Sequence, residues 1–206
     1  MTTRQSWFEG WRLFWLLTLI LTALCVWIAG MRGFEVDGIR MVIRFTARTS
    51  LLFFCLAFSA AALARLYPNA FTRWQRRNRR YLGVTFAASH GIHAIAIACF
   101  AVMAPAGYAA MTSATTYIFG GIGYALIIAM TATSFDRTAM IIGPRAWRIL
   151  HVAGGHYLWL QFMVSFGKRI PNMPLYALFL IPLLAVMALR LIAMTSARSA
   201  PTVRAG

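Results

Sequence analysis

Acidic residues are almost absent from this chain. Only four of its 206 residues are Asp or Glu, against 20 Lys and Arg. None of the four lies inside a long apolar run. The sequence therefore does not predict paired-carboxylate catalysis, a Ser-His-Asp triad, or a Ca²⁺ or Mg²⁺ site, which needs several oxygen ligands.

Cysteine is also scarce. The three cysteines, Cys25, Cys55 and Cys99, all fall in apolar segments, with neither C-x-x-C spacing nor an even count. This pattern does not suggest a disulfide framework, and no C-x-x-C-H is present for covalent haem attachment. We expect the three thiols to serve as packing residues.

Hydrophobic residues, by contrast, make up 61% of the chain, and mean hydropathy is +0.70. About 20 apolar residues are needed to cross a hydrocarbon core of ~30 Å. We therefore predict an all-α integral membrane protein, a six-helix bundle in which residues 1–206 form a single transmembrane domain. The expected helices are 13–30, 50–66, 81–103, 116–134, 149–166 and 175–194.

The net charge of +16 is interpreted as a topology signal and not as a nucleic-acid footprint. With six helices, 14 of the 20 basic residues fall on the side that carries both termini, and six fall on the other. We therefore expect cytoplasmic termini in a multi-pass inner-membrane protein. Residues 31–45 are too polar to span and are expected at the outer surface. The arginine-rich run 73–80 is either purely topogenic or a docking patch for anionic lipid or a partner.

Four histidines are the main candidates for chemistry. His90 and His93 fall in the predicted helix 81–103, and His151 and His156 fall in 149–166. Ionisable side chains inside a membrane usually face the bundle interior. Two facing helices can each offer an imidazole to haem iron, although a histidine can also simply hydrogen-bond a neighbouring helix. The depth of each histidine in the membrane, estimated from the rise per residue of a helix, favours pairing His90 with His156.

Glycines in two predicted helices leave two interpretations open. The glycines of residues 120–123 allow either close helix packing or clearance for a flat cofactor. The pair at 154–155 could distort its helix, and Gly143-Pro144 is expected to precede the start of that helix.

Several short motifs resemble the ferric reductase-like transmembrane domain family, particularly its bacterial MsrQ/YedZ-type haem subunits. Residues 45–51 (FTARTSL) are similar to the start of that family's second helix, and 79–84 (RRYLGV) resembles its R-R-x-L-G-L entry to helix 3. Residues 133–134 (TS) and 147–151 (WRILH) resemble its T-S turn and W-x-x-L-H entry to helix 5.

The resemblance implies that His93 and His151 are axial ligands of b-type haem, with His90 and His156 as alternative ligands. A second histidine that the family commonly carries on helix 5 is replaced here by Val164, so one haem b is expected. Arg48 and Arg65 are candidates to neutralise haem propionates, with snorkelling to the membrane surface as the alternative.

The expected function is thus that of a haem electron-transfer subunit in the membrane, as part of an oxidoreductase. The sequence contains no G-x-G-x-x-G stretch, the motif that would predict a nicotinamide or flavin domain. Electrons are expected from a separate donor, either a cytosolic flavin reductase or a quinol, and the acceptor is not identified. The alternatives are a haem-free scaffold or assembly protein and a small histidine-dependent transporter.

Overall fold

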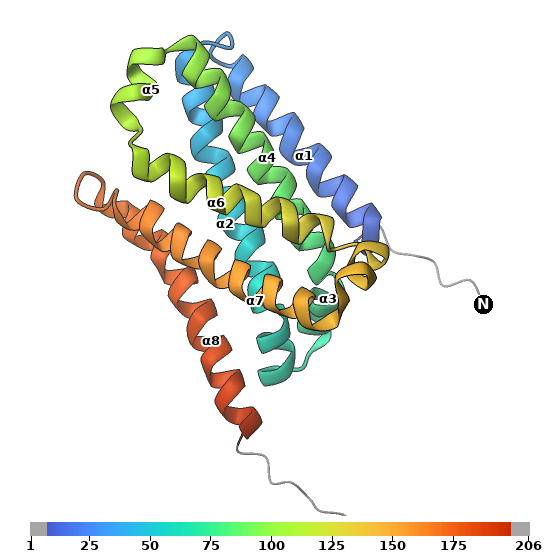
Figure 1. The fold of residues 1–206 in the computed structure, drawn as a ribbon. Coiled ribbons are helices and arrows are strands. Elements are labelled where there is room, and N and C mark those ends of the chain that lie inside the picture. The colour runs from blue at the N-terminus through green and yellow to red at the C-terminus, as the bar shows by residue number, and fades with distance from the viewer. Residues whose placement is uncertain (1–7, 199–206) are drawn as a thin grey trace, which may run out of the picture.

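The computed structural model describes residues 8–198, and within that range it contains helices and no strand (Figure 1). The all-α prediction is confirmed for this part of the chain. The elements are α1 (Gly10–Gly30), α2 (Val36–Leu66), α3 (Ala70–Arg77), α4 (Arg79–Met103), α5 (Pro105–Met111), α6 (Ala114–Ala132), α7 (Asp136–Gly167), the 3-10 helix η1 (Pro174–Phe179) and α8 (Leu180–Arg198).

Five segments of the described chain are long and apolar enough to cross a membrane: α1, α2, α4, α6 and Pro174–Ser196. Many large apolar side chains on these helices point outward, such as Leu19 and Val102, as expected for helices that face lipid. The predicted helix 149–166, which lies within α7, is not among the five. His151, His156 and Gln161 lower its mean hydropathy. The chain is therefore a multi-pass membrane protein, and a sixth crossing stays a prediction.

The first correction concerns α2, which begins at Val36 and not at residue 50. The predicted surface stretch 31–45 is therefore mostly the first part of this helix. Val42 and Thr46 are buried, and Gly38 lets α2 approach α1 closely, since a Cβ at Gly38 would lie 2.9 Å from the carbonyl oxygen of Ala29. A 31-residue helix is ~46 Å long, so at least one of its ends extends beyond the hydrocarbon core.

The second correction concerns α7. It begins at Asp136 and not at residue 149, and Gly143 interrupts it with φ 75° and ψ 164°, a conformation open essentially only to glycine. Pro144 follows and starts the longer part of the helix. The break therefore lies at Gly143, while the helix continues through Gly154 and Gly155.

The remaining predicted boundaries lie within about one helical turn of the observed ones. The short helices α3 and α5 were not predicted. The prediction of cytoplasmic termini concerns residues 1–7 and 199–206, which lie outside the described residues.

The core is centred on α2, which packs along α4 and also contacts α1, α3 and α8. Figure 1 shows α1, α2 and α4 running along the bundle, with α6 and α7 crossing it obliquely. Small hydroxyl residues join α2 to α4. Ser50 Oγ donates to Ser89 Oγ over 2.9 Å, and Thr49 Oγ1 lies 3.0 Å from the same oxygen. Such pairs fix helix register where water is absent.

The glycines of α6 and α7 differ in how closely neighbouring side chains approach them. A Cβ at Gly155 would lie 3.2 Å from the ring of Phe58, and one at Gly154 would lie 2.5 Å from Sδ of Met130. Cβ atoms built at Gly120 and Gly121 would meet nothing within 4 Å. The pair in α7 therefore serves close packing, whereas Gly120 and Gly121 make no such contact in the described chain.

Candidate functional site

The four histidines lie on two helices, His90 and His93 on α4 and His151 and His156 on α7. All four are partly buried. Their hydrogen bonds differ, and these differences show which ring nitrogen of each is available to a ligand.

His93 is held by α2. Its Nδ1 lies 2.9 Å from Thr46 Oγ1 and 3.1 Å from the carbonyl oxygen of Ile43. The Thr46 hydroxyl donates its own hydrogen to the carbonyl of Val42, 2.7 Å away. Both groups near Nδ1 therefore act as acceptors, so Nδ1 of the neutral ring carries the proton. Nε2 keeps its lone pair and is the nitrogen free to bind a metal.

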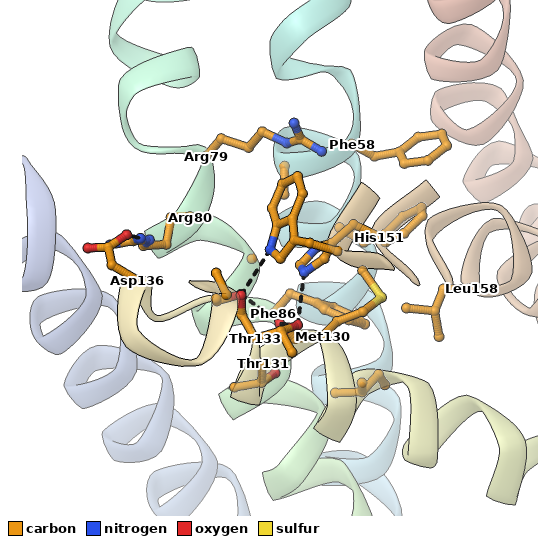
Figure 2. Close-up of a pocket in the computed structure, with 17 residues that line it drawn as sticks. Phe58, Arg79, Arg80, Phe86, Met130, Thr131, Thr133, Asp136, His151 and Leu158 are labelled. Carbon is orange, nitrogen blue, oxygen red and sulfur yellow. Dashed lines mark hydrogen bonds and ion pairs between the residues drawn. The ribbon is translucent and has the colours of Figure 1, made fainter. Parts of the chain in front are cut away.

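His151 is held in a similar way from the turn after α6. Its Nε2 lies 3.1 Å from Thr133 Oγ1 (Figure 2). The Thr133 hydroxyl donates to the carbonyl of Ala129 over 2.8 Å. Trp147 stacks on the imidazole with ring centroids 4.3 Å apart, and its Nε1 donates to the Thr133 carbonyl. Nε2 therefore donates, and Nδ1 is the free nitrogen.

His156 bonds only to its own helix. Its Nδ1 donates to the carbonyl of Val152 over 2.7 Å, and its ring packs edge-on against Phe58. This bond restrains the ring without linking it to another helix.

His90 lies beside His93, with ring centroids 5.2 Å apart, and beside Tyr124 of α6 at 5.1 Å. Its Nδ1 is fully buried without a hydrogen-bond partner, and so is the hydroxyl oxygen of Tyr124. Two unpaired polar atoms in one buried corner are rare in folded proteins, where such groups usually find a partner.

A cavity of ≈ 330 Å³ lies between α2, α4, α6 and α7 (Figure 2). Its walls are mainly apolar, with Phe54, Phe58, Phe86 and Leu158 among them, and His151 is the one histidine that lines it in the described chain. Its size and lining are those of a small-molecule pocket.

Charged groups stand at the edge of this cavity. Arg79 and Arg80 begin α4, and Asp136 begins α7. Arg80 forms an ion pair with Asp136, and this hydrogen bond holds the pKa of the Asp136 carboxyl below its ordinary value. Arg79 has no carboxylate partner among the described residues, so its charge is available to an anionic group.

The histidines of α4 do not contact the histidines of α7 in the described structure. Rings of phenylalanine stand between them: Phe86 and Phe162 contact His90, Phe58 contacts His156, and Phe54 contacts Phe58, Phe86 and Phe162. Ring contacts of the described residues join His90 to His93, but neither of these to His151 or His156. The two helices are thus separated by aromatic side chains.

Arg48 lies away from the cavity, with its guanidinium over the ring of Phe179 at 5.4 Å. Arg65 and Val164 are exposed, and neither lines the cavity. The described residues also contain no group of three or more His, Cys, Asp or Glu placed to hold a metal ion.

Sequence reasoning missed three features of this region. Thr46 and Thr133 fall inside the motifs at 45–51 and 133–134, but a hydrogen bond to a histidine on another helix has no signal in a single sequence. Arg79 was treated only as part of the arginine-rich run 73–80, and its place at the cavity was missed.

Arg190 of α8 was missed as well. It stacks over Phe58 at 4.1 Å and donates to the Phe58 carbonyl, with its Nε buried and unpaired. The sequence did carry a signal for this residue, namely an arginine deep inside an apolar segment.

In comparisons with known proteins, no family model, no curated protein and no solved structure matches this chain.

Proposed function

We propose that this protein is a membrane subunit that binds one haem b between its helices and relays electrons, as the resemblance to the ferric reductase-like family implies. The supporting observation is that His93 and His151, the two positions favoured by that resemblance, are each held through one ring nitrogen by a threonine from outside their own helix. Metal-binding histidines typically carry such a partner, which fixes the tautomer and the ring orientation.

The cavity supports the proposal at His151, the one histidine of the described chain that lines it, whereas His93 lies outside the cavity. Its phenylalanine walls suit a flat apolar ring, and Arg79 suits a carboxylate at the rim. When bound, haem supplies an iron centre that accepts and releases one electron. The chain's own residues then have separate roles: Thr133 orients His151, and Phe54, Phe58 and Phe86 exclude water. Arg48 does not line this cavity and would serve a propionate only beside Phe179.

His90 and His156 are the alternative ligands. Within the described part of the chain, neither has a hydrogen-bond partner from another helix, since His156 bonds within α7 and His90 Nδ1 has no partner. The unpaired nitrogen of His90 would, however, gain a partner from a bound group, so His90 ranks above His156 as a replacement.

We further propose six crossings with both termini in the cytoplasm of a cell whose inner membrane holds the protein. The longer part of α7 supplies the sixth crossing. The first part of α7, with Arg137, Arg145 and Arg148, and the α3 region, with its own arginines, then lie on one side, as the positive-inside rule requires. A separate donor, a quinol or a cytosolic flavin reductase, delivers the electrons, and the acceptor is a further partner.

One observation favours a second candidate, a haem-free scaffold. The phenylalanine rings between α4 and α7 make contacts with one another at 5.0–6.2 Å and so pack this region without a cofactor. A scaffold would keep this packing unchanged.

The experiment that separates the two is a pyridine haemochrome assay on protein purified from haem-replete cells. We expect about one haem b per chain. A ratio near zero would support the scaffold, and a ratio near two would show that Val164 does not mark a lost site.

A further inference from the structure

We propose that the outer face of α3 and its flanks bind the phosphate headgroups of anionic phospholipids. We call this surface the α3 basic face, and it consists of Arg65, Arg73, Arg76 and the neighbouring rings of Tyr67 and Phe71. All five side chains are exposed. The inference does not depend on haem binding.

The inner side of α3 is fixed to the bundle by buried polar residues. Gln75 donates to the carbonyl of Leu56 and to Ser59 Oγ, and Asn78 accepts from the backbone N–H of Gly10 at 2.9 Å. Both side chains are almost fully buried. The arginines on the other side are therefore presented from a rigid support.

The start of α3 is equally well defined. Asn69 and Thr72 form a capping box, in which each side chain accepts from the backbone N–H of the other residue. A cap of this kind stabilises a helix too short to form alone. The spacing of Arg73 and Arg76, one turn apart on α3, is fixed as a result.

The charge of this face is not neutralised within the described chain. Glu9 pairs with Arg77 at 3.1 Å and Asp136 pairs with Arg80, while Glu35 and Asp37 lie at the far end of α2. Ion pairs of the described residues leave Arg65, Arg73 and Arg76 without a carboxylate. The face therefore has a strong excess of positive charge and needs anions from elsewhere.

The position of the face favours lipid as the source of those anions. α3 directly joins the ends of α2 and α4, two of the membrane-spanning candidates, and Figure 1 shows it at the end of the bundle near the start of α1. Segments at helix ends meet the headgroup layer. Arginine binds phosphate through two parallel N–H donors, and exposed rings such as Tyr67 and Phe71 suit the interface between headgroups and acyl chains. We therefore commit to lipid, because the face lies where two membrane-spanning candidates end.

The test uses the full-length protein in nanodiscs made of phosphatidylcholine with phosphatidylglycerol as the minor component. Native mass spectrometry after release into detergent counts the phosphatidylglycerol molecules that stay bound. The test variant is Arg73→Gln/Arg76→Gln. The matched control is Arg32→Gln/Arg44→Gln, which removes the same charge from two exposed arginines at the other end of α2 and its preceding turn.

We expect bound phosphatidylglycerol to exceed its share of the bilayer in the wild type and the control, and to fall about threefold or more in the test variant. Equal retention in all three, or equal loss in both variants, would overturn the proposal. If the test variant fails to insert into the membrane, the enrichment of phosphatidylglycerol on the wild type still tests the proposal. Retention of phosphatidylglycerol must also fall as the salt concentration is raised, because salt screens exposed charges. Retention that does not depend on salt would overturn the proposal as well. So would retention of phosphatidylglycerol no greater than that of phosphatidylcholine.

Discussion

Thr133 Oγ1 lies 3.1 Å from Nε2 of His151, across the turn that joins α6 to α7. The same kind of contact joins Thr46 Oγ1 to Nδ1 of His93 at 2.9 Å. One threonine thus holds one histidine on each of the two helices, while no hydrogen bond among the described residues joins His90 or His156 to another helix. This difference favours His93 and His151 as ligands over the pair suggested by estimated depth.

The first prediction concerns Thr133. Thr133→Val removes the acceptor for His151 and leaves the ring free to turn, so we expect haem affinity to fall by ~10–100-fold. Haem titration of the apoprotein, followed by absorption, measures it. Thr131→Val is the matched control, because Thr131 lines the same cavity without a hydrogen bond between its side chain and a histidine. Equal losses in both variants would mean that the contact with His151 has no special role.

The second prediction concerns the sixth crossing. Arg137 near the start of α7 and Lys168 just after its end are both exposed. Single cysteines at these positions, in a background with Cys25, Cys55 and Cys99 replaced by serine, should react with a membrane-impermeant thiol reagent from opposite sides. Labelling of both from one side would show that α7 does not cross and would leave five spans.

The third prediction concerns helix packing. In Gly155→Ala the new Cβ would lie 3.2 Å from a ring atom of Phe58, which is held between Phe54, His156 and Arg190. Overpacking of this kind typically costs ~1–3 kcal/mol, more than the gain of up to ~1 kcal/mol from replacing glycine in a helix. Tm in detergent should therefore fall.

The control for that prediction is Gly120→Ala on α6. A Cβ there meets nothing within 4 Å, so we expect Tm to stay the same or rise slightly through helix propensity. If Gly155→Ala were as stable as Gly120→Ala, the close approach of Phe58 to α7 would be wrong.

Much of the fold could be predicted because hydropathy alone marks the long apolar helices. The prediction failed at the start of α2, where Glu35, Asp37, Arg40 and Arg44 lower the hydropathy of a helix whose other side buries Val42. It also failed before Gly143, where seven polar and apolar residues form a helical segment ahead of the break. Amphipathic segments at helix ends do not carry the signal that hydropathy detects.

The candidate site could be predicted only in part. Histidine in an apolar helix is visible in the sequence, so all four candidates were found. The threonine partners, the cavity and the arginine at its rim depend on which helices lie side by side, and a single sequence does not contain that information. Arg79 illustrates this, because its place at the cavity follows from the oblique path of α6 and α7 past the start of α4 (Figure 1).

The most direct test of the account is the absorption spectrum of four single variants, His90→Ala, His93→Ala, His151→Ala and His156→Ala, purified beside the wild type. Removing one axial imidazole leaves the iron without its main protein bond on that side. We expect the wild type to show a low-spin b-type spectrum, His93→Ala and His151→Ala to lose most or all of it, and His90→Ala and His156→Ala to keep most of it. Full spectra in His93→Ala and His151→Ala would contradict the account.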